Sequence, residues 1–110
     1  MSCSDLDAAL KAVCARTYHL GAPDRLSEYE YIVWREYGVR TIDGDDISVV
    51  RIPRVQIDAF SQDDAPLDEH PFFGAVMDAL DELELAFTVE SYDYDDDAAL
   101  MRLIIQTDVC

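Results

Sequence analysis

The sequence predicts an α+β domain, in which two helices pack on one face of a largely antiparallel four-stranded sheet. Two segments repeat apolar residues every three or four positions, as helices do, and four segments alternate or are rich in β-branched and aromatic residues, as strands are. Their order is αββαββ, which is typical of a sheet with its helices on one side. No linker or repeat interrupts the 110 residues, so residues 1–110 are expected to form a single domain.

The first helix is predicted from about Ser4 to His19. Ser4 can cap its start, and two aspartates in its first turn suit the positive end of the helix dipole. A glycine and a proline at positions 21 and 23 are expected to end it. Its apolar positions define one buried stripe: Leu6, Ala9, Leu10, Val13, Cys14 and Thr17.

A strand is predicted from about Ser27 to Tyr37, and it carries large side chains on both faces. Tyr29, Tyr31 and Val33 would lie on one face, with Ile32 and Trp34 on the other. A strand of this kind is covered on both sides. Two helices can cover one face, so a neighbouring subunit is a plausible cover for the other.

Residues 39–42 either extend this strand or begin a short hairpin arm, and residues 43–46 contain an Asp-Gly turn signal. The next strand is predicted over 47–61. Pro53 interrupts it and marks an edge or a bulge, because proline cannot donate to a ladder. Beyond Pro53 the alternation places Val55, Ile57 and Ala59 toward the core.

A polar loop over 62–70 leads to a second helix, predicted from Pro71 to Leu85. Strands are predicted over Phe87–Tyr94 and Leu100–Asp108, with a turn at 95–97 between them. The apolar stripe of the second helix consists of Phe73, Val76, Met77, Leu80 and Leu83.

Charge is the dominant bulk property of the chain. Eight Lys and Arg against 24 Asp and Glu give a net charge of −16. Such a surface repels nucleic acid and anionic membranes, so neither is expected as a partner. One interpretation of this charge is that the carboxylates imitate DNA phosphates. The simpler one, which we favour, is an acidic, soluble cytoplasmic or virion protein.

Three cysteines, an odd number without metal-site spacing, indicate free thiols in a reducing compartment. The first residues lack the basic and apolar pattern of a signal peptide, and no apolar run approaches the roughly 20 residues that span a bilayer. We therefore expect a protein that is made and kept in the cytoplasm, or packaged from there.

Metal and catalytic signatures are weak. Asp93, Asp95 and Asp97 match three positions of a calcium loop, but Ala98 and Ile104 stand where that loop needs Gly and Glu. The two histidines have no ligand partner at helical spacing, and no local motif groups a nucleophile with a base. No cofactor, metal or catalytic residue is predicted, and the protein is expected not to be an enzyme.

The arginines on predicted strands leave two interpretations open. Arg35, Arg51, Arg54 and Arg102 can pair with carboxylates of an adjoining subunit, or with neighbours inside their own sheet. Aromatic strand residues are likewise enriched at interfaces but common in cores. The candidate subunit interface consists of Tyr29, Tyr31, Trp34, Arg35, Arg54 and Arg102.

The chain resembles the tail-terminator and tail-completion proteins of long-tailed bacteriophages. Three segments carry the resemblance: Tyr31-Ile32-Val33-Trp34-Arg35 as a first strand, the strand over residues 54–61 with its Val-Gln-Ile-Asp pattern, and the end of the chain, where a helix, Ala86-Phe87 and an Asp-containing hairpin lead into a last strand.

This resemblance implies a structural virion protein without catalytic activity. It would form a homo-oligomeric ring, expected to be a hexamer, on the last tail-tube ring, ending tube polymerisation at the head-tail junction and contacting the head connector. Terminator, completion and neck roles all remain open. An acidic nucleic-acid mimic that inhibits a DNA-binding protein is the main alternative, and a small-molecule-binding or enzymatic α+β domain is another.

Overall fold

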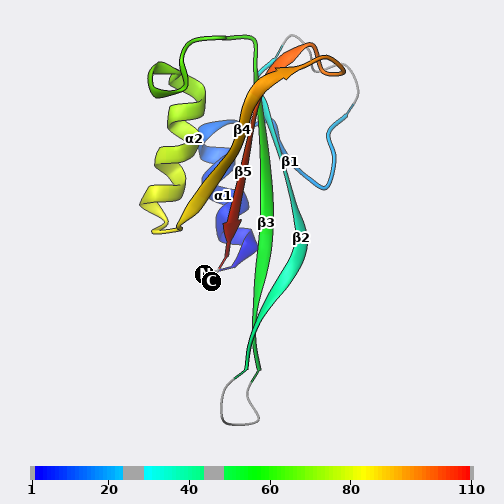
Figure 1. Cartoon of the computed structure of the whole chain (residues 1–110), viewed down its shortest axis with the longest axis vertical. Helices are drawn as coiled ribbons and strands as arrows, with labels where there is room; N and C mark the ends of the chain where they lie inside the picture. The colour runs from blue at the N-terminus through cyan, green and yellow to red at the C-terminus, as the bar shows by residue number, and fades with distance from the viewer. Residues whose placement is uncertain (1, 24–28, 44–48, 110) are drawn as a thin grey trace.

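The computed structural model describes residues 2–23, 29–43 and 49–109. These residues form one five-stranded mixed sheet in the order β1-β2-β3-β5-β4, together with two α-helices (Figure 1). The elements are α1 (Cys3–Val13), β1 (Thr17–His19), β2 (Tyr31–Asp43), β3 (Val49–Ser61), the 3₁₀ turn η1 (Leu67–Glu69), α2 (Pro71–Glu82), β4 (Phe87–Asp95) and β5 (Leu100–Asp108).

The α+β class is confirmed, but the four-stranded antiparallel sheet is a wrong prediction. The first helix ends at Val13 rather than near His19, and Thr17–His19 forms β1, which pairs parallel with β2. β-branched Thr17 and aromatic Tyr18 favour extended backbone, and the edge of β2 offers them a ladder. The hydroxyl of Thr17 donates to the carbonyl of Cys14 at 2.7 Å and so holds the change of direction.

The start of α1 also differs from the prediction. Ser2 rather than Ser4 caps the helix, and its side chain and backbone exchange hydrogen bonds with Asp5 in a capping box. α2 begins at Pro71 as predicted and ends at Glu82, three residues before the predicted end. His70 caps it, because its Nδ1 accepts from the backbone N–H of Phe73 at 3.1 Å.

β2 and β3 continue beyond the rest of the sheet as a two-stranded arm, in which residues 39–43 pair with residues 49–53 (Figure 1). The arm arises because β5 pairs with β3 only from Arg54 onward. The predicted Asp-Gly turn and the predicted start of β3 fall on residues 44–48, outside the described residues. The predicted extension of the first strand over 39–42 is confirmed.

Pro53 lies where the arm leaves the sheet. Its carbonyl accepts from the N–H of Val109 at 2.9 Å, on the side of β3 that faces β5. The two backbone groups of a strand residue point to the same side, so the missing N–H of Pro53 faces a position just past the last β3–β5 pair. Proline is therefore tolerated at the point where β3 becomes an edge strand, as the sequence predicted.

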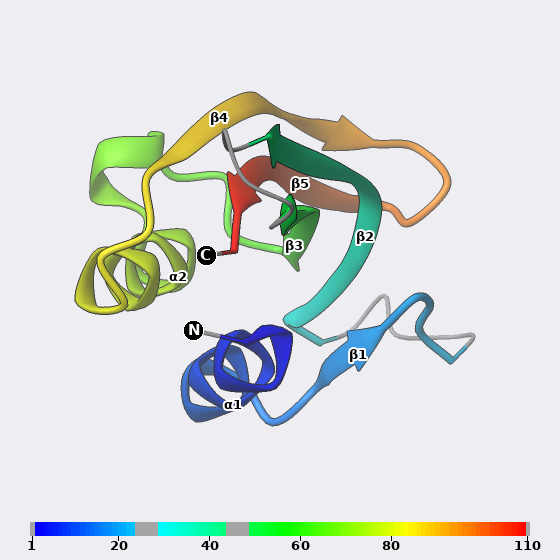
Figure 2. The same cartoon turned by 90° about the horizontal axis from the view of Figure 1, so that it is seen from below.

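The core lies between the sheet and the two helices, which cover the same face (Figure 2). Val55, Ile57 and Ala59 are fully buried, which confirms the predicted alternation of β3. The other buried core residues include Leu6, Leu10, Ile32, Phe73, Val76, Leu80, Leu103 and Ile105. None of the described helices is both long and apolar enough to span a bilayer.

Candidate interaction surface

The sheet face opposite the helices, called the outer face below, is where the predicted interface residues were expected. Strand register places Tyr31, Phe60, Arg102 and Asp93 in one row across β2, β3, β5 and β4. Two residues further along each strand, Val33, Asp58, Ile104 and Ser91 form the next row. Side chains of alternate residues share a face, so both rows belong to the outer face.

The upper part of the outer face is closed by an arginine cluster. The Tyr31 and Phe60 rings stack with centroids 4.5 Å apart, and the Arg102 guanidinium lies 5.7 Å from the Phe60 centroid. Arg102 Nη2 is 2.6 Å from Asp58 Oδ2, and its Nη1 is 3.1 Å from Asp95 Oδ2. Phe60 is consequently only 7% exposed although no helix lies over it.

Asp95 connects this cluster to the β4–β5 turn. Its Oδ1 accepts from the backbone N–H groups of Asp97 and Ala98 at 2.9 and 3.0 Å. The bond from Ala98, with Arg102 nearby, lowers the pKa of Asp95 below its usual range. The acidic tip thus holds itself in place through a carboxylate that stays charged. Across the described ranges, no group of three His, Cys, Asp or Glu residues could hold a metal ion.

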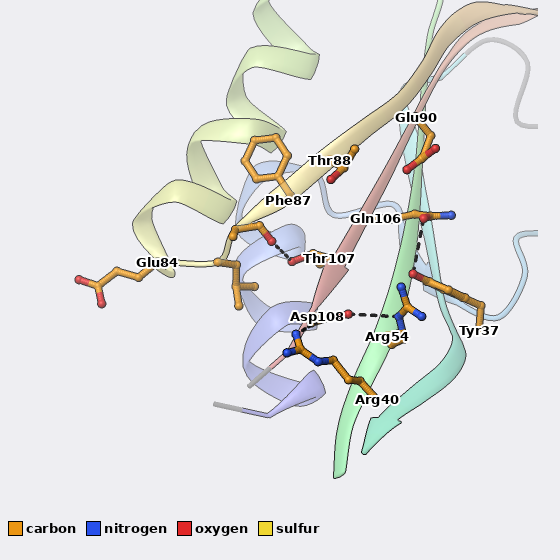
Figure 3. A pocket seen from close by; sticks show the side chains of 12 residues that line it. Tyr37, Arg40, Arg54, Glu84, Phe87, Thr88, Glu90, Gln106, Thr107 and Asp108 are labelled. Atoms are coloured by element: carbon orange, nitrogen blue, oxygen red, sulfur yellow. Dashed lines mark hydrogen bonds and ion pairs between the residues drawn. The ribbon is translucent and has the colours of Figure 1, made fainter. Parts of the chain in front are cut away.

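The lower part of the outer face opens into a shallow hollow of about 520 Å³ at the base of the arm (Figure 3). Arg40 and Arg54 both point to a single carboxylate, that of Asp108, at 3.4 and 3.5 Å. The Arg54 guanidinium also lies 5.3 Å from the ring centroid of Tyr37. The two guanidinium groups share this one carboxylate, and Glu84 and Glu90 also line the hollow.

Four cations, Arg35, Arg40, Arg54 and Arg102, therefore lie on the outer face by register and contact, half of the eight Lys and Arg in the chain. Most of the 24 acidic residues lie elsewhere, including a row on α2 at Asp78, Asp81 and Glu82 that is exposed. Half of the cations thus gather on one face of a strongly acidic chain, where three of the four pair with carboxylates.

The six predicted interface residues are not equivalent in the structure. Tyr31 and Arg102 take part in the cluster within the subunit, so they follow the cross-strand interpretation. Tyr29 and Arg35 are exposed, and within the described residues Arg35 forms no ion pair. Arg54 is exposed and shares Asp108 with Arg40.

Trp34 lies on the opposite face, under α1, and is 4% exposed. Its indole Nε1 donates to Asp7 of α1 at 2.8 Å, which links the helix to β2. It is therefore a core residue of the subunit rather than part of the outer face.

A second polar cluster, which the sequence did not predict, surrounds Trp34. His19 stacks on the indole at 4.0 Å, and its Nε2 is 2.5 Å from Glu36 Oε1. The hydrogen bond from His19 lowers the pKa of Glu36. Cys3 lines a hollow beside this cluster, but burial raises the pKa of its thiol, so the thiol is not activated as a nucleophile. The cluster joins α1, β1 and β2. No sequence motif predicts it, because the parallel pairing of β1 with β2 is what brings its residues together.

Comparisons with known proteins show a similarity in fold. No protein-family description matches the sequence, and no curated protein matches it. The fold is similar to that of a chain in a solved structure described as "Virion of native gene transfer agent (GTA) particle". The two chains share 16% sequence identity with a TM-score of 0.50, and the match covers 96% of this chain and 89% of that chain. At this identity, the similarity shows that the fold is shared.

Proposed function

We propose that this chain is a structural protein of a long-tailed bacteriophage or phage-like particle. It forms a ring, expected to be a hexamer, at the head-proximal end of the tail, where it ends tail-tube polymerisation and joins the tail to the head connector. Its partners are copies of itself, the tail-tube protein and connector proteins. No catalytic activity, nucleic acid or membrane is part of the proposal.

The observation that carries this proposal is the fold similarity to a virion chain over nearly the full length of both chains. A similarity of 96% and 89% coverage concerns the whole domain rather than a shared supersecondary motif. Apart from the short strand β1, the order of helices and strands is the αββαββ order that the sequence predicted.

The charge distribution supports self-association of a head-to-tail kind. The outer face concentrates half of the cations, while exposed carboxylates dominate the helices and β4. A contact between two different surfaces of the same protein is heterologous, and it closes into a ring when the rotation closes. A chain whose cations gather on one face while its exposed carboxylates dominate others favours this arrangement over a twofold dimer.

Salt should control assembly, because a hexamer concentrates a formal charge of 6 × −16 = −96. Repulsion between exposed carboxylates is screened over about 10 Å at 0.1 M salt but over about 30 Å at 0.01 M. We expect monomers at low salt and rings at higher salt or on the end of a tail tube.

The test is the solution mass of the protein, measured by light scattering across salt concentrations with and without purified tail tubes. Rings of one defined mass, or binding to one end of the tubes in electron micrographs, support the proposal. A protein that stays monomeric at every salt concentration and ignores tail tubes contradicts it.

A nucleic-acid mimic is the second candidate, and the exposed acidic row on α2 favours it. Carboxylates spaced along one helix can imitate phosphates to a DNA-binding protein. Inhibition of such a protein by the monomer, relieved by excess DNA, would favour the mimic over the ring.

A further inference from the structure

Exposed apolar side chains lie along the two sides of the sheet and not on its helices. Among the described residues, the large hydrophobic side chains with high exposure are Leu20, Tyr29, Tyr37, Val39, Val89 and Tyr94. The first four lie beside β1 or on β2, at one side of the sheet, and the last two lie on β4, at the other. An apolar strand edge whose backbone groups are unpaired is open to pairing with another chain.

One of these two sides is β4, referred to as the β4 edge (Phe87–Asp95). It is the last strand of the sheet and pairs only with β5. Val89 and Tyr94 are 37% and 57% exposed on it. The strand contains no Lys or Arg, and its Glu90 and Asp93 are exposed. It therefore offers backbone hydrogen-bonding groups and apolar side chains with a negative charge.

The second side is the length of β2 that β1 leaves uncovered, referred to as the β2 edge (Arg35–Asp43). β1 pairs only with residues 32–34 of β2. The remaining residues of β2 pair with β3 on one side alone. Val39 is 56% exposed here, and Arg35 and Arg40 provide positive charge. The carboxylate of Glu36 is held by His19.

The two edges run in opposite directions. Three antiparallel pairings, β2–β3, β3–β5 and β5–β4, separate them, so β4 is antiparallel to β2 within a subunit. A rotation about an axis roughly along the strands preserves strand direction. In a ring whose subunits are related by such a rotation, β4 of one subunit would therefore lie antiparallel to β2 of the next. Antiparallel pairing is the more stable form.

We propose that the β4 edge of one subunit pairs with the β2 edge of the next, so that neighbouring sheets join through main-chain hydrogen bonds. This inference rests on the proposed ring and names the surface that closes it. Val89 of one subunit then lies opposite Val39 of the other, and the same antiparallel register places Asp93 opposite Arg35 on the outer face.

Charge selects this pairing over the alternatives. Two β4 edges brought together would oppose carboxylates, and charged edge residues normally prevent such pairing. The β2 edge with Arg35 and Arg40 removes that repulsion. The acidic β4 edge therefore rejects its own copy and accepts the opposite edge, which gives a head-to-tail assembly.

Strand register adds a geometric consequence. Arg35 lies in the same row as Gln56, Gln106 and Thr88, so the free part of β2 starts level with the beginning of β4 and continues into the arm. Pairing the two edges displaces each subunit along the strands relative to the next. Closed barrels absorb such stagger by tilting their strands by about 35–45°. The ring is therefore expected to have tilted strands.

Charge reversal tests the seam. Arg35→Glu and Asp93→Arg are each expected to weaken ring formation at least roughly tenfold, because like charges then face each other across the seam. An equimolar mixture of the two variants, or the double variant, restores opposite charges and is expected to recover assembly to within roughly threefold of the unaltered protein. Arg51→Glu is the matched control, since Arg51 is exposed and unpaired among the described residues but lies on β3.

The readout is sedimentation velocity at a salt concentration where the unaltered protein forms rings, with thermal melts to verify that each variant is folded. Rings that form equally well with Arg35→Glu and Asp93→Arg overturn the seam while leaving the ring itself intact. Loss of assembly in the single variants without recovery in the mixture also overturns it. If the unaltered protein forms no ring, alone or on tail tubes, the proposed function fails as well.

Cross-linking gives a second measurement. Val39 and Val89 share the helix-side face by register, so cysteines at these positions would lie on the same side of a joined sheet. In a background with Cys3, Cys14 and Cys110 changed to Ser, mild oxidation of mixed Val39→Cys and Val89→Cys proteins should yield heterodimers. Homodimers of either variant in place of heterodimers would contradict the seam.

Discussion

The two faces of the sheet solve the same burial problem by different means. On the helix-covered face, Ile57, Leu103 and Ile105 are fully buried by apolar side chains of α1 and α2. On the outer face, Phe60 is almost as well buried, yet a tyrosine ring and the pairs of Arg102 are what cover it. Burial of an aromatic strand residue is therefore not evidence for a second layer or for a partner.

The outer face itself has two parts, which differ in how their charges are paired. Its upper part satisfies its charges internally, with Arg102 between Asp58 and Asp95. Its lower part, near the arm, holds Arg35 without an ion pair among the described residues and two arginines that share Asp108. The lower part is the one with cations to offer a neighbour.

The largest effect is expected on the helix-covered face. Leu80→Ala, like Leu10→Ala, removes a fully buried side chain and should lower the free energy of unfolding by about 2–5 kcal/mol. Denaturant unfolding followed by circular dichroism measures it. Val39→Ala is the control, because that side chain is 56% exposed and should change stability little. Equal losses for both changes would show that the helices do not form the core.

A smaller effect is expected on the upper outer face. Arg102→Leu keeps an apolar group over Phe60 but leaves Asp58 and Asp95 without their cation, at a cost of about 1–2 kcal/mol. The same unfolding experiment applies, with Arg51→Leu as the control that lacks these partners. If Arg102→Leu were as neutral as the control, the cluster would not be what closes this face.

How well the sequence predicts each face depends on how far apart in the sequence the interacting residues lie. The alternation of Val55, Ile57 and Ala59 and the spacing of the helix residues are local, and they predicted the helix-covered face correctly. The cover of Phe60 joins residues from β2, β3 and β5, up to 71 positions apart, and no local pattern records it. The bulky residues on both faces of β2 therefore suggested that a neighbouring subunit covers the outer face, although side chains of the same subunit cover part of it.

The missed strand β1 has a similar explanation. Thr17 fits the spacing of a helix face and also has high strand propensity, and only the free edge of β2 decides between the two. Trp34 was grouped with interface residues because aromatic residues serve both cores and interfaces, and its bond to Asp7 depends on how α1 docks. Arg35 and Arg54 do lie on strands, as predicted, and their place in a subunit interface stays a prediction.

Acid should weaken the upper outer face through Asp95. Its pKa is lowered in the folded chain, by the bond from Ala98 first, so the stability it adds is present above the unfolded pKa of about 3.9. That stability is lost as pH falls through the lower, folded pKa. Asp95→Asn should therefore reduce stability at pH 7, and the difference from the unaltered protein should shrink below about pH 4. Urea unfolding at several pH values measures it, and a difference that stays constant with pH would contradict this role.

The smallest effect on the fold is expected at the lower outer face, where Arg35→Glu should change the stability of the monomer by less than about 0.5 kcal/mol. Arg35 is exposed and has no ion pair among the described residues to lose. Arg54→Glu should cost more, because it brings a carboxylate beside Asp108, from which Arg54 Nε is now 3.5 Å. Added salt should reduce that extra cost, since it screens exposed like charges. Unfolding of both variants at low salt, where the monomer is expected, separates this effect from assembly. Equal destabilisation by the two changes would show that Arg35 has a partner within the subunit, and the lower outer face would then have no free cation at the edge of β2.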